Sequence, residues 1–185
     1  MDRLTVGSTL LLVVDVQERL ASAMPPARLD AVLRNAGILL DAAERLGVPV
    51  LASEQYPKGL GPTCEPLASR LRARGAPPHA KTTFDACGDP AIARAVSALS
   101  PRAVVLVGME THVCVFQTAR ELARRGVTVH VVADAVSSRT DENREIGLRL
   151  CERAGAIITA TETVVFDWLE RAGTDDFKAV SKLVK

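Results

Sequence analysis

Three residues of this sequence combine a reactive side chain with a place beside a predicted strand or helix end: Asp15, Lys81 and Cys114. Asp15 directly follows the apolar run LLLVV, which is typical of a buried strand. Ligands of open α/β sheets bind beyond the carboxyl ends of the strands, so this carboxylate could be a partly desolvated base at a pocket edge. It could equally cap the segment that follows it.

Cys114 lies in the segment VGMETHVCVFQTA, just after another apolar run. If Thr111 caps the next helix, Cys114 falls in the first turn, where backbone dipoles favour a thiolate and lower the thiol pKa. The backbone N–H groups there could also stabilise the oxyanion that forms when sulfur attacks a carbonyl carbon. The alternative is a buried structural cysteine. Cys87 and Cys151 fit that alternative, and Cys64 lies in a proline-rich segment.

Lys81 stands in the segment HAKTTF, close to the middle of the chain. Most lysines are solvated surface groups. The neighbours of this lysine suit an ammonium group that faces inward toward a carboxylate: Ala80, Thr82, Thr83 and Phe84.

Alternating strands and helices must position these side chains. Five runs rich in Val, Leu and Ile predict strands that are buried on both faces of a parallel sheet: 9–14, 48–52, 103–107, 127–133 and 156–159. Helical periodicity separates them, with apolar residues three and four positions apart over 29–46, 92–99, 115–123 and 146–154. We therefore expect an α/β fold, a three-layer α/β/α sandwich with a mostly parallel sheet.

The segment 53–90 interrupts this rhythm with most of the prolines of the chain and the sequence GLGPT. We expect a loop and a short helix there that form one wall of a pocket. The tail 174–185 is predicted to be a final amphipathic helix. With 185 residues and no internal repeat, the chain is expected to be a single domain over residues 1–185.

The composition excludes several kinds of partner. The 23 Lys and Arg residues against 22 Asp and Glu give a net charge of +1, which provides no field to attract nucleic acid or an anionic membrane. No apolar stretch approaches the roughly 18 residues of a membrane span. No P-loop or complete dinucleotide fingerprint is present, so no cofactor is expected. The scattered cysteines and histidines predict free thiols in a reducing cytoplasm and no metal site.

The segments LLVVDVQ, AKTTF and VGMETHVCVFQTA together resemble the three signature blocks of the isochorismatase-like cysteine hydrolases. The resemblance covers nearly the whole chain and extends to EQYPKGLGPT, SSR and FK…KL, which the short isochorismatase-domain-containing proteins share. It implies a doubly wound sheet in which Cys114 is the nucleophile, Asp15 the general base, and Lys81 the cation that holds both. Family members with all three residues hydrolyse C–N bonds of small amides through a thioester.

The resemblance also implies features around the nucleophile. A cis peptide between Met109 and Glu110 would direct the Glu110 N–H toward the same point as the Cys114 N–H, and the two would form the oxyanion hole. Gln17 either lines the substrate pocket or hydrogen-bonds to a loop backbone. Tyr56 and Phe84 are expected to be flat walls of the pocket.

Two departures from the wider family narrow the reaction. The nicotinamidase branch carries an Asp-x-His metal motif where this chain reads SEQYPKG, so we expect neither a metal nor nicotinamide as the substrate. Members that cleave the vinyl ether isochorismate can dispense with the cysteine, so Cys114 favours acyl chemistry and a small-molecule amide. The alternatives are a non-catalytic binding or scaffold protein on this fold, an isochorismate-type ether hydrolase, and a redox-sensing thiol.

The last two predicted helices carry more apolar residues than a small helix pair needs: Val164, Val165, Trp168, Leu169, Phe177 and Val180. These residues either cap the core or form a subunit contact. Because proteins of the resembled family commonly form dimers and higher assemblies, we expect a homo-oligomer.

Overall fold

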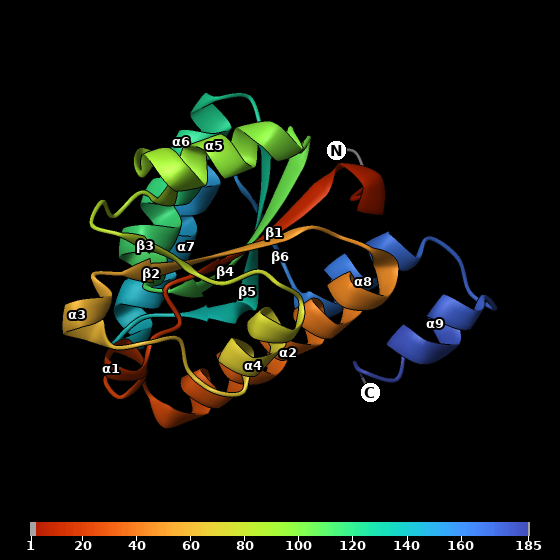
Figure 1. Cartoon of the computed structure of the whole chain (residues 1–185), viewed down its shortest axis with the longest axis horizontal. Helices are drawn as coiled ribbons and strands as arrows, with labels where there is room; N and C mark the ends of the chain where they lie inside the picture. The colour runs from red at the N-terminus through yellow and green to blue at the C-terminus, as the bar shows by residue number, and fades with distance from the viewer. Residues whose placement is uncertain (1–2, 185) are drawn as a thin grey trace.

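The computed structural model describes residues 3–184 and contains a six-stranded parallel sheet in the order β3-β2-β1-β4-β5-β6 (Figure 1). The strands are β1 (Thr9–Val14), β2 (Val50–Gln55), β3 (His79–Lys81), β4 (Ala103–Met109), β5 (Thr128–Ser137) and β6 (Ile157–Thr159). The strand order changes direction between β1 and β4, and doubly wound sheets bind ligands at such a switch point. The expected three-layer α/β/α fold is confirmed.

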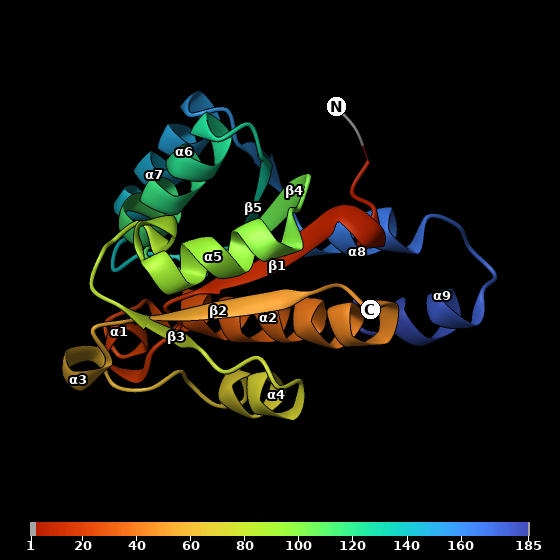
Figure 2. The same cartoon turned by 45° about the horizontal axis from the view of Figure 1, so that its top comes forward.

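Helices cover both faces of the sheet. One face carries α2 (Pro26–Leu46), α4 (Leu67–Ala73), α8 (Thr161–Leu169) and α9 (Asp175–Val180), and the other carries α5 (Pro90–Leu99), α6 (Phe116–Arg124) and α7 (Asp141–Arg153) (Figures 1 and 2). The short helices α1 (Glu18–Ala21) and α3 (Pro57–Leu60) lie near the carboxyl ends of β1 and β2. Within residues 3–184, no helix is long and apolar enough to cross a membrane.

Local sequence signals begin and end these helices. Pro26 opens α2, and Gly47 ends it in the left-handed conformation with φ 76°. Asp89 caps α5, since its carboxylate accepts hydrogen bonds from the N–H groups of Ala91 and Ile92 at 2.9 and 3.2 Å. These residues fix where α2 begins and ends and where α5 begins.

The core has two halves because the central strands are buried on both faces. All residues of β1 and β4 are buried, and their side chains divide between two hydrophobic clusters, one under each helical layer. Gly108 shows how closely β4 approaches β1: a Cβ at this position, where φ is 120°, would lie 1.9 Å from the Val14 carbonyl oxygen. Only glycine fits this contact at the switch point.

Several strand ends differ from the sequence prediction. β2 begins at Val50 and continues through polar residues to Gln55, β4 continues to Met109, and β5 continues to Ser137. β3 was not predicted and lies inside the segment that we expected to be a loop and a short helix. β3 pairs with β2 over Ser53–Gln55, so the segment 53–90 contains a strand as well as α3 and α4. Hydrophobic runs mark where a strand is buried, and they miss the polar strand ends that form a site.

The apolar residues of the last two helices pack inside the chain. Those that we named as a core cap or a subunit contact all belong to the core under α2, or pack against it: Val164, Val165, Trp168, Leu169, Phe177 and Val180. They therefore cap the core, which is the first of the two roles that the sequence left open.

Candidate active site

Asp15 lies at the switch point, directly after β1. Its backbone is left-handed, with φ 51°, a conformation that a short polar side chain tolerates better than most. The Asp15 N–H bonds to the Ser53 carbonyl oxygen at 3.1 Å, and the Asp15 carbonyl oxygen accepts from the Gln17 N–H at 2.9 Å. The chain therefore turns away immediately, and the Asp15 carboxylate is left fully buried at the end of the strand without capping a helix.

The carboxylate of Asp15 is held by two donors. Lys81 Nζ donates to Oδ2 at 2.7 Å, and Ser53 Oγ donates to Oδ1 at 2.7 Å. The side chains of both Asp15 and Lys81 are 0% exposed. A buried ion pair is retained only where hydrogen bonds satisfy its remaining atoms, and each carboxylate oxygen here has a partner.

Lys81 is the last residue of β3, and its ammonium group makes further bonds. It donates to Gln55 Oε1 at 2.6 Å and to the carbonyl oxygens of Thr83 at 3.1 Å and Phe84 at 3.4 Å. Gln55 Nε2 in turn donates to the Thr82 carbonyl oxygen at 2.9 Å. The ammonium group therefore has a fixed position beneath the 82–84 loop.

Sequence reasoning missed Ser53 and Gln55. The predicted strand ended at Ala52, whereas β2 continues to Gln55. Because alternate residues of a strand share a face, both side chains point toward Asp15 and Lys81. The sequence signal that could have identified Ser53 and Gln55 is their position two residues apart, directly after an apolar run.

Cys114 lies in a π-helical turn, Thr111–Val115, that precedes α6. Glu110 is the N-cap, so Thr111 is not the cap that the sequence suggested. The Glu110 carbonyl oxygen accepts hydrogen bonds from the N–H groups of Val113 at 3.0 Å and Val115 at 3.2 Å. The N–H of Cys114, which lies between these two residues in the sequence, does not bond to this oxygen. Cys114 is 5% exposed and still belongs to the first turn, where backbone N–H groups lack helical partners.

Gly147 on α7 determines the position of this turn. A Cβ on Gly147 would lie 2.6 Å from the His112 backbone nitrogen and 2.7 Å from the Thr111 carbonyl carbon. Both contacts are to backbone atoms, which cannot move aside as a flexible side chain would. The glycine therefore lets α7 pack directly on the nucleophile turn.

Burial, and not the helix dipole, dominates the acidity of Cys114. Burial raises its pKa, the negative charge of Asp15 raises it further, and Lys81 acts in the opposite direction, so the pKa is about 12. The expectation of a lowered thiol pKa is wrong because the sulfur is taken out of water. Burial also raises the pKa of Cys151 to about 12, without a neighbouring carboxylate or ammonium group. Its charged neighbours, and not its pKa, distinguish Cys114.

Glu110 supplies both backbone and side chain to this end of the sheet. The Met109–Glu110 peptide is cis, as the family resemblance implied. The Glu110 carboxylate is mostly buried, and its Oε1 accepts from the Arg139 Nε at 3.0 Å and from the Arg139 backbone N–H at 3.2 Å. The Arg139 side chain is 58% exposed, so a cation stands beside the nucleophile turn.

The three expected pocket residues have different surroundings. Gln17 is buried, and its amide is used by the backbone: Nε2 donates to the carbonyl oxygens of Gln55 and Gly61, and Oε1 accepts from the Gln55 N–H. Of the two roles that the sequence left open, the structure places Gln17 in the backbone-bonding one, because the left-handed turn at Asp15 ends the extended strand. Tyr56 borders a cavity of 360 Å³ next to Lys81, and both Tyr56 and Phe84 are more than half exposed.

The remaining cysteines are structural. Cys64, Cys87 and Cys151 are buried and free, and burial is the largest cause that raises the pKa of each. Across residues 3–184, no group of three or more His, Cys, Asp and Glu side chains is arranged to hold a metal ion.

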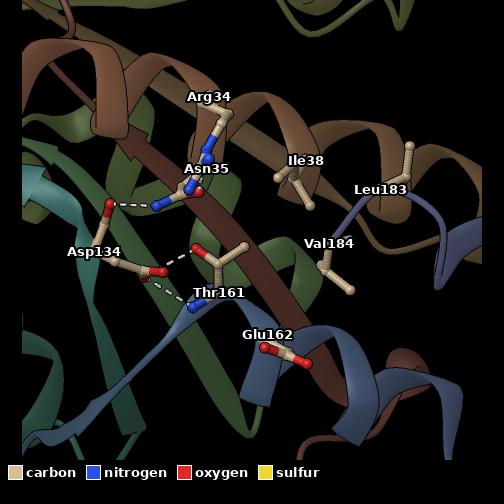
Figure 3. A pocket seen from close by; sticks show the side chains of 8 residues that line it. All are labelled: Arg34, Asn35, Ile38, Asp134, Thr161, Glu162, Leu183 and Val184. Carbon is tan, nitrogen blue, oxygen red and sulfur yellow. Dashed lines mark hydrogen bonds between the residues drawn. The ribbon is translucent and has the colours of Figure 1, made fainter.

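A second cavity, of 250 Å³, lies between α2, β5, α8 and residues 183–184 (Figure 3). Its polar side chains largely serve the fold. Asp134 Oδ1 accepts from the N–H and the hydroxyl of Thr161, at the first turn of α8, and Asn35 Nδ2 donates to the Asp134 carbonyl oxygen. None of the three reactive residues lines it, so the candidate active site is the buried cluster at the switch point.

Comparison with known proteins identifies the family that this chain resembles. Residues 9–163 match the Isochorismatase domain family. Isochorismatase domain-containing protein 2 of Danio rerio is 36% identical over 182 residues, which cover 98% of this chain and 89% of that protein.

Solved structures show the same similarity. The structure described as MAR1 ribonuclease from Caenorhabditis elegans has a TM-score of 0.86 and 36% identity, and the match covers 99% of this chain and 92% of that one. The YcaC gene product of Escherichia coli, described as an octameric hydrolase of unknown specificity, has a TM-score of 0.83 and 25% identity over 91% of this chain and 83% of that one. The family resemblance that the sequence indicated is confirmed.

Proposed function

Since this chain belongs to the isochorismatase family, whose membership supports a hydrolase function, we propose that it is a cysteine hydrolase. Its substrate is a small amide, whose C–N bond is cleaved through a thioester on Cys114. The observation that carries the proposal is the buried Asp15 carboxylate, bonded to Lys81 at 2.7 Å and close enough to Cys114 to raise its thiol pKa. A carboxylate beside a thiol is the arrangement that nucleophilic catalysis needs.

In the first half of the reaction, the thiol of Cys114 loses its proton to Asp15 as the sulfur attacks the carbonyl carbon. A thiol with a pKa of about 12 is protonated at neutral pH, so proton transfer accompanies attack instead of preceding it. The carbonyl oxygen takes up the negative charge and is stabilised by the N–H groups of Glu110 and Cys114. The C–N bond then breaks, and Asp15 returns the proton to the leaving amine.

In the second half, Asp15 removes a proton from water, which attacks the thioester carbon, and the sulfur leaves and recovers its proton. Lys81 stays charged throughout and offsets the cost of holding a carboxylate in a closed site. Neither a cofactor nor a metal ion takes part in these steps. The residues that hold a nicotinamidase metal are replaced here by SEQYPKG, which supports this assignment.

On the substrate side, we assign Tyr56 and Phe84 as pocket walls and no longer include Gln17. The assignment is supported by Tyr56, which borders the cavity beside Lys81, and by the Phe84 carbonyl oxygen, which accepts a hydrogen bond from Lys81 Nζ. The amide of Gln17 is already occupied by backbone groups.

A panel of small amides tests the proposal, with isochorismate included to represent vinyl ether cleavage. We expect wild type to hydrolyse at least one amide and Cys114→Ala to lose that activity, whereas Cys151→Ala, a second buried thiol, keeps it. If Cys114→Ala hydrolyses the amide as fast as wild type, the mechanism is wrong. Cleavage of isochorismate alone, with Cys114 dispensable, would support the ether hydrolase instead, and no turnover of any member would support a binding protein.

We also propose that the protein is a homo-oligomer of the cytoplasm. The octameric E. coli relative supports assembly. Size-exclusion chromatography with light scattering tests the assembly. A mass of 19.7 kDa would refute it.

A further inference from the structure

Ser53 gives the Asp15 carboxylate an unusual asymmetry. Oδ1 of Asp15 faces the Ser53 hydroxyl at 2.7 Å, and Oδ2 faces the Lys81 ammonium group at 2.7 Å. An ammonium group only donates hydrogen bonds, whereas a hydroxyl can donate or accept by rotating. The two oxygens of one carboxylate therefore differ in what they can do when a proton arrives.

A proton on Oδ2 would compete with the ammonium group for the same oxygen. A proton on Oδ1 leaves Oδ2 as a carbonyl oxygen that still accepts from Lys81, so the neutral acid is favoured in that form. The Ser53 hydroxyl, which is 2% exposed, can then turn from donor to acceptor, so both oxygens of the neutral acid keep a hydrogen-bond partner.

We propose that Ser53 is the positioning residue that makes Oδ1 the proton-carrying oxygen of Asp15. The inference rests on the proposed function and deepens it, because it assigns the base to one atom. As sulfur attacks, the S–H bond of Cys114 breaks, an O–H bond forms at Asp15 Oδ1, and Ser53 Oγ changes its role. When the proton leaves Asp15, the hydroxyl donates again.

The fold supports this role for Ser53. Its carbonyl oxygen also accepts from the Asp15 N–H at 3.1 Å, so backbone and side chain of one residue hold both ends of Asp15. Gln55, two residues further along β2, holds Lys81 from the same face. These two β2 side chains thus hold both members of the buried ion pair, Ser53 the Asp15 carboxylate and Gln55 the Lys81 ammonium group.

An isosteric pair of variants isolates the hydroxyl. Ser53→Thr keeps it, and Ser53→Val has the same shape without it, so any difference in packing is shared by the two proteins. The measured quantity is the rate at which iodoacetamide alkylates Cys114, followed by peptide mass spectrometry across a range of pH. Alkylation needs the thiol proton to be removed and needs no substrate, so its outcome is independent of whether the protein hydrolyses amides.

We expect Ser53→Val to be alkylated at Cys114 about tenfold more slowly than Ser53→Thr, because the acid that forms on Oδ1 has lost its hydrogen-bond acceptor. Cys151, which is fully buried, serves as an internal control for unfolding, and Ser97→Ala removes an exposed hydroxyl elsewhere.

Equal alkylation rates of Cys114 in Ser53→Thr and Ser53→Val across the range of pH would overturn the inference. So would a slow rate in Ser53→Val that is accompanied by faster labelling of Cys151, since that pattern reports unfolding. In either case the hydrolysis assay with Cys114→Ala still decides the proposed function separately.

Discussion

Replacing Lys81 with methionine tests how strongly the buried ion pair is coupled. The substitution removes the ammonium group that faces Asp15 and leaves a side chain of similar length. Because the side chains of both residues are 0% exposed, water cannot take the place of the cation. Removing one partner of a buried pair costs about 3–5 kcal/mol of unfolding free energy. In a protein of this size, that loss lowers Tm by roughly 6–20 °C.

A double-mutant cycle separates the pair energy from the general cost of substitution. The four proteins are wild type, Lys81→Met, Asp15→Asn and the double variant, and each is unfolded with urea. We expect the double variant to be markedly more stable than the sum of the single losses predicts, because it carries no unpaired buried charge. Additivity within about 0.5 kcal/mol would refute the reasoning, since it would mean that the two side chains do not interact in the folded protein.

Three other predictions concern the surroundings of the pair. Gly147→Ala should lower kcat by about 10- to 100-fold, because the added Cβ displaces the nucleophile turn. Gly7→Ala is the control and should leave kcat unchanged, since a Cβ on Gly7 would have no atom within 4 Å. A wild-type kcat in Gly147→Ala would contradict the packing argument. Gln55→Leu removes the acceptor nearest to the Lys81 ammonium group, at 2.6 Å, and should cost about 1–3 kcal/mol in urea unfolding. An unchanged midpoint would argue against the role of Gln55. Buried thiols should also make stability fall with alkaline pH. The pKa of Cys151 rises from 9.0 to about 12 on folding, so its contribution to the free energy of unfolding is complete below pH 9.0 and is lost toward pH 12. Urea unfolding on both sides of pH 9.0 should show this loss of stability, and Cys151→Ala should reduce it. An equal dependence of stability on pH in wild type and variant would contradict the prediction.

The strand ends explain why most of the candidate site was visible in the sequence. Asp15 directly follows β1, Cys114 lies in the turn after β4, and Lys81 ends β3, so strand–helix alternation brings all three to one edge of the sheet. The type of each of these residues, and the position of Asp15 and Cys114 after a strand, could be read directly from the sequence. That Asp15 and Lys81 form one hydrogen-bonded cluster with Ser53 and Gln55 depends on side-chain geometry, which no pattern of residue types specifies.

The errors also have physical causes. β3 has three residues and follows two prolines, so it leaves no hydrophobic run to find. For Gln17 the sequence leaves two roles open, and the backbone of Asp15, whose φ of 51° redirects the chain, decides between them. The acidity of Cys114 was judged from the helix terminus alone, while burial, which the sequence does not report for a single atom, outweighs the dipole.

The mass of the protein during turnover is the most direct test of the central claim, that Cys114 forms a thioester. Wild type is mixed with an amide that it hydrolyses, quenched in acid within one turnover, and digested for peptide mass spectrometry. The account predicts a mass increase equal to the acyl group on the peptide that contains Cys114, and no such increase in Cys114→Ala. An acyl group on any other residue, or undiminished turnover after Cys114 has been fully alkylated, would contradict it.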